Sequence, residues 1–184
     1  MSRRNLKPQR SRFFIGCEGE SEQSYVAVVQ RLLGPRSAVH LVARVLNGGD
    51  PLAIVESALK AIRAERAKGR EPFLRRFIFL DADLRGLSPE RDGRCHALAA
   101  KERITLVWQT PCHEAMLLRH LEGCETRRPA TTATSMESLK RAWPEYKKGM
   151  AAQDLESRID LEALRRAIRI NDEIALFLRE VGIR

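Results

Sequence analysis

The sequence predicts a single α/β domain with a central, mainly parallel sheet of about four strands flanked by helices. Three observations support this prediction. Short apolar runs alternate with amphipathic segments along most of the chain, Gly and Pro mark many of the transitions, and residues 77–80 form an unbroken apolar run. Strand–helix alternation is typical of layered α/β domains. An unbroken apolar run is typical of a strand that is covered on both faces.

The first strand and helix are predicted on either side of an acidic junction. A short apolar run predicts a buried strand over residues 12–18. Three carboxylates then fall at alternate positions, Glu18, Glu20 and Glu22. The amphipathic residues that follow predict a helix over 21–33, which a Gly-Pro pair ends.

A second strand and helix are predicted from the next segment. Leu and Val residues indicate a strand over 40–46, and an Asn-Gly-Gly sequence after it is typical of a tight turn. Asp50 and Pro51 suit the N-cap and first position of a helix. This helix carries its apolar residues on one face, as a packing helix does, and ends near residues 68–69.

The third and fourth strands are predicted at residues 75–80 and 104–108, with a helix between them that Ser88 and Pro89 open and that ends near residue 102. The regular alternation stops after the fourth strand. The remaining segments are predicted as a short helix ending before Gly123, a loop over 124–134, a brief helix over 136–142 and a final helix over 161–180.

Length and charge limit the classes to which this protein can belong. Its 184 residues suffice for one domain, which we expect to span residues 12–184, with residues 1–11 as a flexible basic arm. Lys and Arg total 33 against 24 acidic residues, which gives a formal net charge of +9. A basic protein attracts polyanions, so we expect nucleic acid as its partner.

Signals for secretion and membrane insertion are not found in the sequence. The basic N-terminus is not followed by an apolar segment, so we expect no signal peptide. No window approaches 18 apolar residues, so we expect no contact with a membrane. The four cysteines show no CxxC spacing. We therefore expect a cytoplasmic protein with reduced cysteines.

Carboxylates follow two of the predicted strands. Glu18, Glu20 and Glu22 come after the first strand, and Asp81 and Asp83 end the third, where extended geometry would place both side chains on one face. Ligands of α/β sheets bind at this carboxyl edge, and clustered carboxylates oppose one another's ionisation unless a cation neutralises them. Oxygen ligands suit Mg²⁺ or Mn²⁺. In the alternative interpretation, Glu20 and Glu22 only complement the helix dipole.

A second group of side chains contains the residue types that bind zinc. These are Cys112, His113, His120 and Cys124. Cys112 and His113 are adjacent and would point apart on a helix, so we do not expect a zinc site here.

Three motifs of the chain resemble the RloB family. They are Glu-Gly-Glu-Ser-Glu at 18–22, Asp-Ala-Asp at 81–83 and Pro-Cys-His-Glu-Ala-Met-Leu-Leu-Arg-His-Leu at 111–121. The resemblance extends from about residue 12 to the last helix, and the third motif is the most distinctive. That family is counted with the Toprim-like domains, alongside the OLD-family nucleases. The resemblance therefore implies a Toprim-like, Rossmannoid fold.

The same resemblance implies a role for each acidic residue. Glu18 is similar to the glutamate that ends the first Toprim strand, which serves as a metal ligand or general acid/base. Glu22 resembles the OLD-type glutamate four residues further on. Asp81 and Asp83 resemble the metal-binding DxD, and Glu114 resembles the glutamate of the following helix. All five are thus implied ligands of Mg²⁺ or Mn²⁺.

A lysine near the end of the chain completes the implied site. Residues 146–149 resemble the family's later Tyr-x-Lys region, from which Lys147, or its neighbour Lys148, would offset the charge of a phosphate. The chain also departs from the family's pattern. His113 and Met116 stand where the family usually has aromatic residues, and Arg119 stands where it has an aliphatic one.

The implied activity is metal-assisted hydrolysis of phosphodiester bonds in DNA or RNA, with a role in bacterial defence or restriction. Two rival functions stay open: a module that binds nucleic acid or a protein partner through an inactive or structural metal site, and nucleotidyl transfer, which other Toprim domains perform. The motif GxxxxGK[ST] does not occur, so any ATP dependence requires a partner ATPase. A homo-oligomeric state also stays open.

Overall fold

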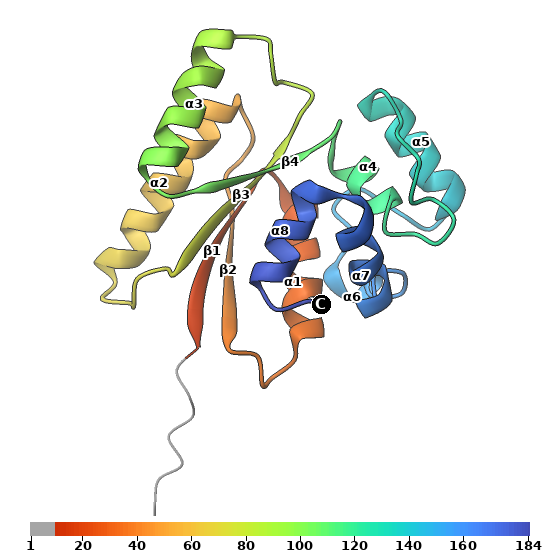
Figure 1. The fold of residues 1–184 in the computed structure, drawn as a ribbon, viewed down its shortest axis with the longest axis horizontal. Helices are drawn as coiled ribbons and strands as arrows, with labels where there is room; N and C mark the ends of the chain where they lie inside the picture. The colour runs from red at the N-terminus through yellow and green to blue at the C-terminus, as the bar shows by residue number, and fades with distance from the viewer. Residues whose placement is uncertain (1–9) are drawn as a thin grey trace, which may run out of the picture.

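The protein is built on a four-stranded sheet in which every neighbouring pair of strands is parallel. The computed structural model describes residues 10–184, and its strands lie in the order β2-β1-β3-β4 (Figure 1). The bounds of the strands are β1 Ser11–Cys17, β2 Val39–Val45, β3 Arg75–Asp81 and β4 Thr105–Gln109. The predicted α/β class and parallel sheet are confirmed.

Helices cover both faces of this sheet. Helix α1 (Glu20–Leu33) packs on one face with α8 (Asp172–Glu180), whereas α2 (Pro51–Ala67) and α3 (Pro89–Lys101) lie on the opposite face (Figure 1). Successive strand residues point to opposite faces. Accordingly, Phe13 and Phe77 belong to the core under α1 and α8, and Phe14 and Ile78 belong to the core under α2 and α3. The unbroken apolar runs of the sequence reflect this double covering.

The order of the strands creates a topological switch point between β1 and β3. The chain leaves β1 for α1 on one face of the sheet and leaves β3 for α3 on the other (Figure 1). The segments that follow these two adjacent strands therefore separate. In open α/β sheets, ligands bind at the carboxyl ends of strands at such a switch point.

The C-terminal third is helical and packs beside α1. Its helices are α4 His113–Leu118, α5 Thr132–Ala142, α6 Ala152–Leu155, α7 Leu161–Ile170 and α8 Asp172–Glu180. The single final helix predicted over 161–180 is wrong. Asn171 leaves the helical conformation (φ −138°, ψ 96°), and its side chain accepts a hydrogen bond from the backbone N–H of Glu173 at 3.2 Å. It thereby ends α7 and caps α8. Helix α5 also begins earlier than predicted, because Thr131 caps it.

The structure describes only part of the N-terminal arm that the sequence predicts. Residues 1–9 of the expected basic arm lie outside the described residues, and residue 11 already belongs to β1. Among residues 10–184, no helix combines the length and apolar character needed to cross a membrane.

A buried carboxylate connects α2 to the edge of the sheet. Glu65, near the end of α2, has a side chain that is only 2% exposed. It contacts four cationic side chains at 2.8–3.0 Å: Arg12 of β1, Arg44 of β2, Lys68 and Arg70. Hydrogen bonds from Arg44, Lys68 and Arg12 hold the pKa of Glu65 well below its ordinary range. The carboxylate thus fixes the C-terminal end of α2 against β1 and β2.

We expect Glu65→Gln to lower the free energy of unfolding at pH 7 by about 2 kcal/mol, because neutral Gln leaves the surrounding cations without a counter-charge. A depressed native pKa stabilises the fold above the ordinary Glu pKa, and this contribution is lost as the pH falls through the native pKa. The difference from wild type, measured by urea unfolding, should therefore shrink as the pH falls below about 4.

Glu56→Gln is the matched control, because Glu56 is exposed on the same helix. It should change the urea midpoint little at either pH. Equal effects of the two substitutions would contradict a stabilising role for the Glu65 cluster.

Candidate functional site

The carboxyl ends of β1 and β3 bring two acidic residues into contact. Glu18 directly follows β1, and Asp81 is the last residue of β3. Oε2 of Glu18 accepts a hydrogen bond from the backbone N–H of Asp81 at 3.0 Å. The backbone carbonyl of Glu18 accepts a second one, from Gly48 N–H in the loop after β2, at 3.0 Å. Glu18 is therefore held at the switch point by segments on both sides.

Helix α1 begins at this point and brings a third carboxylate. The backbone N–H of Gly19, the N-cap residue, donates to Oε2 of Glu22 at 3.0 Å. Glu22 is 4% exposed, whereas Glu20 is exposed at the rim of the cavity. Glu22 thus caps α1 through one oxygen, a role that neither the metal interpretation nor the helix-dipole interpretation of the sequence included. Its Oε1 atom is directed away from this cap and lies 3.7 Å from Nδ1 of His113.

Helix α4 closes the other side of the site. The backbone N–H of His113, its first residue, donates to Oδ1 of Asp81 at 2.9 Å. The side chains of His113 and Glu114 are buried, at 2% and 1% exposure. Oε1 of Glu114 and Nε2 of His113 have no hydrogen-bond partner among the described residues. Such atoms are rare in folded proteins and indicate a missing ligand or water.

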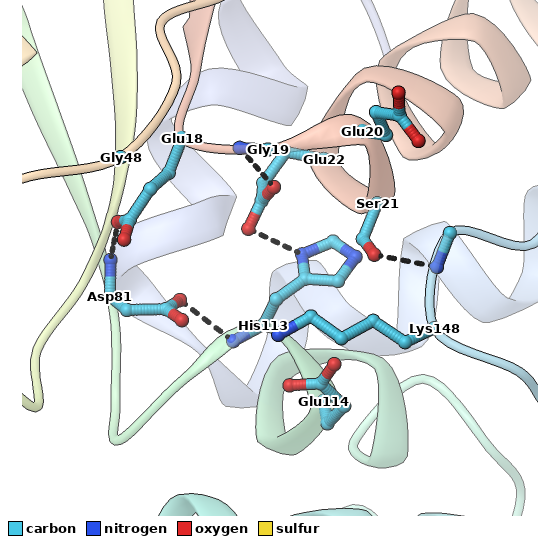
Figure 2. A pocket seen from close by; sticks show the side chains of 11 residues that line it. Glu18, Gly19, Glu20, Ser21, Glu22, Gly48, Asp81, His113, Glu114 and Lys148 are labelled. Atoms are coloured by element: carbon cyan, nitrogen blue, oxygen red, sulfur yellow. Dashed lines mark hydrogen bonds and ion pairs between the residues drawn. The ribbon is translucent and has the colours of Figure 1, made fainter.

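These segments enclose a cavity of about 370 Å³ at the carboxyl edge of the sheet. Figure 2 shows the carboxylates, His113 and Lys148 around it, with Lys148 extending beneath the His113 ring. The turn that carries Lys148 is attached to α1, because Gly149 N–H donates to Oγ of Ser21 at 3.0 Å. The residues that line the cavity are Glu18, Gly19, Glu20, Ser21, Glu22, Gly48, Asp81, His113, Glu114, Lys148 and Gly149.

Four of the five acidic residues expected in the site line this cavity, namely Glu18, Glu22, Asp81 and Glu114. Asp83 does not line it. The strand ends at Asp81 and the chain turns, with Arg85 N–H bonded to the carbonyl of Ala82 at 3.1 Å. Asp83 is therefore exposed, and its Oδ2 accepts a hydrogen bond from Oγ1 of Thr132 at 3.3 Å.

The two candidate lysines lie in different places. Lys148 lines the acidic cavity. Lys147, the lysine first expected to face the phosphate, lines a separate surface cavity with Trp143 and Asp154. The turn at Lys148 and Gly149 directs the two adjacent side chains apart, and no pattern in the sequence distinguishes them.

Burial and mutual repulsion disfavour charge on the central carboxylates. Burial, together with the nearby charges of Glu18, Glu22, Glu114 and Asp83, raises the pKa of Asp81 to about 8. Burial also raises the pKa of Glu18, although the hydrogen bond from Asp81 N–H and the charge of Lys148 oppose this shift. A cation bound in the cavity would remove this penalty.

The side chains that line the cavity are of the types that bind a divalent cation, although their positions do not enclose one. Within residues 10–184, no three His, Cys, Asp or Glu side chains lie close enough to hold an ion as they stand. However, the cavity is lined by several carboxylates, which are the ligands of Mg²⁺ and Mn²⁺. Glu114 also has a buried oxygen without a partner. Glu18, Glu22, Asp81 and Glu114 are therefore the residues that would hold a metal here.

The group with zinc-ligand residue types does not converge. Both ring nitrogens of His120 are engaged, because Nε2 lies 3.0 Å from the Tyr25 hydroxyl and Nδ1 lies 2.9 Å from the carbonyl of Met116. Cys112 and Cys124 are buried free thiols. Only His113 of this group lines the acidic cavity.

Sequence reasoning missed a polar residue at the end of β4. Gln109 is 1% exposed, and its amide is satisfied only when the carbonyl oxygen accepts from Nδ1 of His113 at 2.7 Å and the NH₂ group donates to Glu22 at 3.3 Å and Asp81 at 3.2 Å. A buried amide thus links α1, β3 and α4. A polar residue at the end of an apolar strand, beside the Pro-Cys-His-Glu motif, is the signal that could have identified it.

In the presence of a chelator, we expect Asp81→Asn to raise the melting temperature at pH 8. An acid whose native pKa is raised destabilises the fold progressively as the pH rises from its ordinary pKa, about 4, to its native pKa. Asn removes that charge, so the advantage over wild type should diminish towards pH 4. Asp83→Asn, at the exposed neighbouring acid, should raise the melting temperature much less, because Asp83 is only the last of the causes that raise the pKa of Asp81. If Asp81→Asn were equally destabilising at both pH values, the carboxylate would be a needed hydrogen-bond acceptor instead.

The chain was compared with known proteins in three ways. Residues 13–176 match the model of the family described as RloB-like protein. The curated proteins and the solved structures contain no match. The matched segment includes every acidic residue that lines the cavity and extends from β1 into α8. The chain therefore belongs to the RloB-like family.

Proposed function

We propose that this protein is a nuclease that hydrolyses phosphodiester bonds of DNA or RNA with the help of Mg²⁺ or Mn²⁺. The observation that supports this most is the convergence of five carboxylates and one lysine on a single cavity at the switch point of the sheet. Acidic residues at such an edge are suited to hold a cation against a phosphate. The likeness of the motifs to Toprim and OLD nucleases agrees with this chemistry.

The protein's own groups have distinct tasks in this proposal. A bound divalent cation would polarise the scissile phosphate and lower the pKa of a water. Glu18, Glu22 and Asp81 would hold the cation. The unpartnered oxygen of Glu114 would orient the attacking water or receive its proton. The Lys148 ammonium would offset the negative charge that develops on the phosphate.

The substrate class follows from charge. A formal net charge of +9 on 184 residues favours association with a polyanion, whereas the cavity itself is acidic. A phosphate group could approach the carboxylates only with a cation between them. This combination favours nucleic acid as the substrate. We also propose, from family membership, a role in bacterial defence or restriction, with any ATP dependence supplied by a partner.

One observation favours the alternative function, a binding module without catalytic activity. Since no three His, Cys, Asp or Glu side chains of residues 10–184 are placed to hold an ion, the protein could bind nucleic acid or a protein partner through an inactive site. Binding without cleavage under every metal condition would favour that module. Products that form only with nucleoside triphosphates would favour nucleotidyl transfer.

We expect Asp81→Asn to lower metal-dependent cleavage by about 100-fold or more while leaving affinity for nucleic acid largely intact, because it removes a proposed metal ligand and retains the basic surface. Cleavage of DNA and total RNA would be followed on gels with Mn²⁺, Mg²⁺ or chelator. Affinity would be measured by fluorescence anisotropy in chelator. Equal cleavage by variant and wild type would contradict the proposed site.

Lys148→Ala and Lys147→Ala form a matched pair that tests the geometry. We expect the larger loss of cleavage at Lys148, which lines the acidic cavity, because only its charge lies near the proposed phosphate site. Initial rates at saturating substrate would measure this difference. A larger loss at Lys147 would show that the side chains around the turn are arranged differently when substrate is bound.

A further inference from the structure

His113 carries a buried nitrogen that no group in the described part of the chain uses. Its side chain is 2% exposed and lines the acidic cavity, yet Nε2 has no hydrogen-bond partner among residues 10–184. The adjacent Glu114 has a buried oxygen in the same situation. A buried polar atom without a partner costs free energy, so two of them on neighbouring residues at one cavity point to a ligand that contacts both.

The hydrogen-bond network assigns the proton on the His113 ring. The amide of Gln109 must direct its NH₂ group towards Glu22 and Asp81, because the reverse orientation would place its oxygen against two carboxylate oxygens. Its carbonyl oxygen then faces Nδ1 of His113 at 2.7 Å. Nδ1 therefore carries the hydrogen, and in neutral imidazole the other nitrogen has a free lone pair. Nε2 is thus an acceptor.

The tautomer of His113 limits which kinds of ligand could contact both Nε2 and Glu114. A lone pair on imidazole and an oxygen on a carboxylate are both electron donors, so their common partner is a cation or a hydrogen-bond donor. Metal-binding histidines characteristically donate their other ring N–H to a neighbouring acceptor, which fixes the ring and the tautomer. Gln109 provides that acceptor to His113. Figure 2 shows the ring between Glu22 and Ser21, with Glu114 below it.

The type of donor affects which cation is preferred. Carboxylate and water oxygens suit Mg²⁺, Ca²⁺ and Mn²⁺, whereas imidazole suits transition metals such as Zn, Cu, Fe and Ni. Mg²⁺ is a hard cation that takes oxygen ligands. A cavity lined by His113 and by several carboxylates therefore favours a transition metal over Mg²⁺, and Mn²⁺ is the transition metal that also suits carboxylate oxygens.

We propose that His113 binds the metal through Nε2 and that this nitrogen makes the site select Mn²⁺ over Mg²⁺. The proposal rests on the proposed metal-dependent function, and it specifies the metal and one ligand of the same site. It also gives a reason for His at a position where the resemblance to the RloB family leads one to expect an aromatic residue.

The test is a spectroscopic measurement on the intact wild-type protein. The protein would be loaded with Mn²⁺ alone and examined by electron spin-echo envelope modulation, which detects a nitrogen nucleus bound to Mn²⁺. We expect a nitrogen coupling that changes when histidine is labelled with ¹⁵N. Bound Mn²⁺ with oxygen ligands only would overturn the proposal and leave the nuclease function standing. Failure to bind either Mn²⁺ or Mg²⁺ would overturn both.

Two variants give a second readout by calorimetric titration with each metal separately. His113→Phe should weaken Mn²⁺ binding by about 10-fold or more and change Mg²⁺ binding little, because it removes only the nitrogen donor. His113→Gln, a smaller polar replacement, covers the case in which Phe does not fit. His96→Phe is the control, since His96 is an exposed histidine on α3. Equal losses for both metals would show that His113 only shapes the cavity.

Discussion

The backbone N–H of Asp81 donates to Glu18 where β3 and β1 end, and this contact brings two carboxylates into one crevice. Neither residue can move away independently. Oδ1 of Asp81 also accepts from the backbone N–H of His113, and the backbone carbonyl of Glu18 accepts from the N–H of Gly48. The α/β topology thus enforces a close approach of like charges. The arrangement of α1 and α4 around the cavity depends on the same contacts.

Such a site is maintained at the expense of stability, so other parts of the fold must compensate. The pKa of Asp81 is raised to about 8, which shows how strongly its surroundings oppose ionisation. The sheet, covered on both faces, supplies two apolar cores that hold the strand ends in position. Glu65 shows the opposite electrostatic pattern, because four cations surround one buried carboxylate. The Glu65 cluster, whose charges stabilise the fold, therefore lies apart from the cavity carboxylates, whose ionisation the fold disfavours.

The strands were predictable from sequence to within about one residue, because buried parallel strands are marked by apolar runs that depend on few distant contacts. Predictions were wrong or incomplete where single polar contacts decide the path of the chain. Asn171 interrupts a pattern that is otherwise amphipathic throughout. Asp83 leaves the crevice because Ala82 N–H bonds to the distant carbonyls of Gln109 and Pro111, at 3.1 and 2.9 Å. The direction of Lys148 depends on a similar contact between Gly149 and α1.

Glu22 shows that the capping and metal interpretations of the acidic motif are compatible. Oε2 of Glu22 accepts from the N-cap residue Gly19, which fixes the carboxylate at the start of α1. Oε1 is thereby directed towards Gln109 and His113, inside the site. A ligand that is already held by a backbone hydrogen bond loses little conformational freedom when a cation binds. The cap would therefore prepare Glu22 for the proposed metal, since Oε2 positions the group and Oε1, which also accepts from Gln109, faces the site.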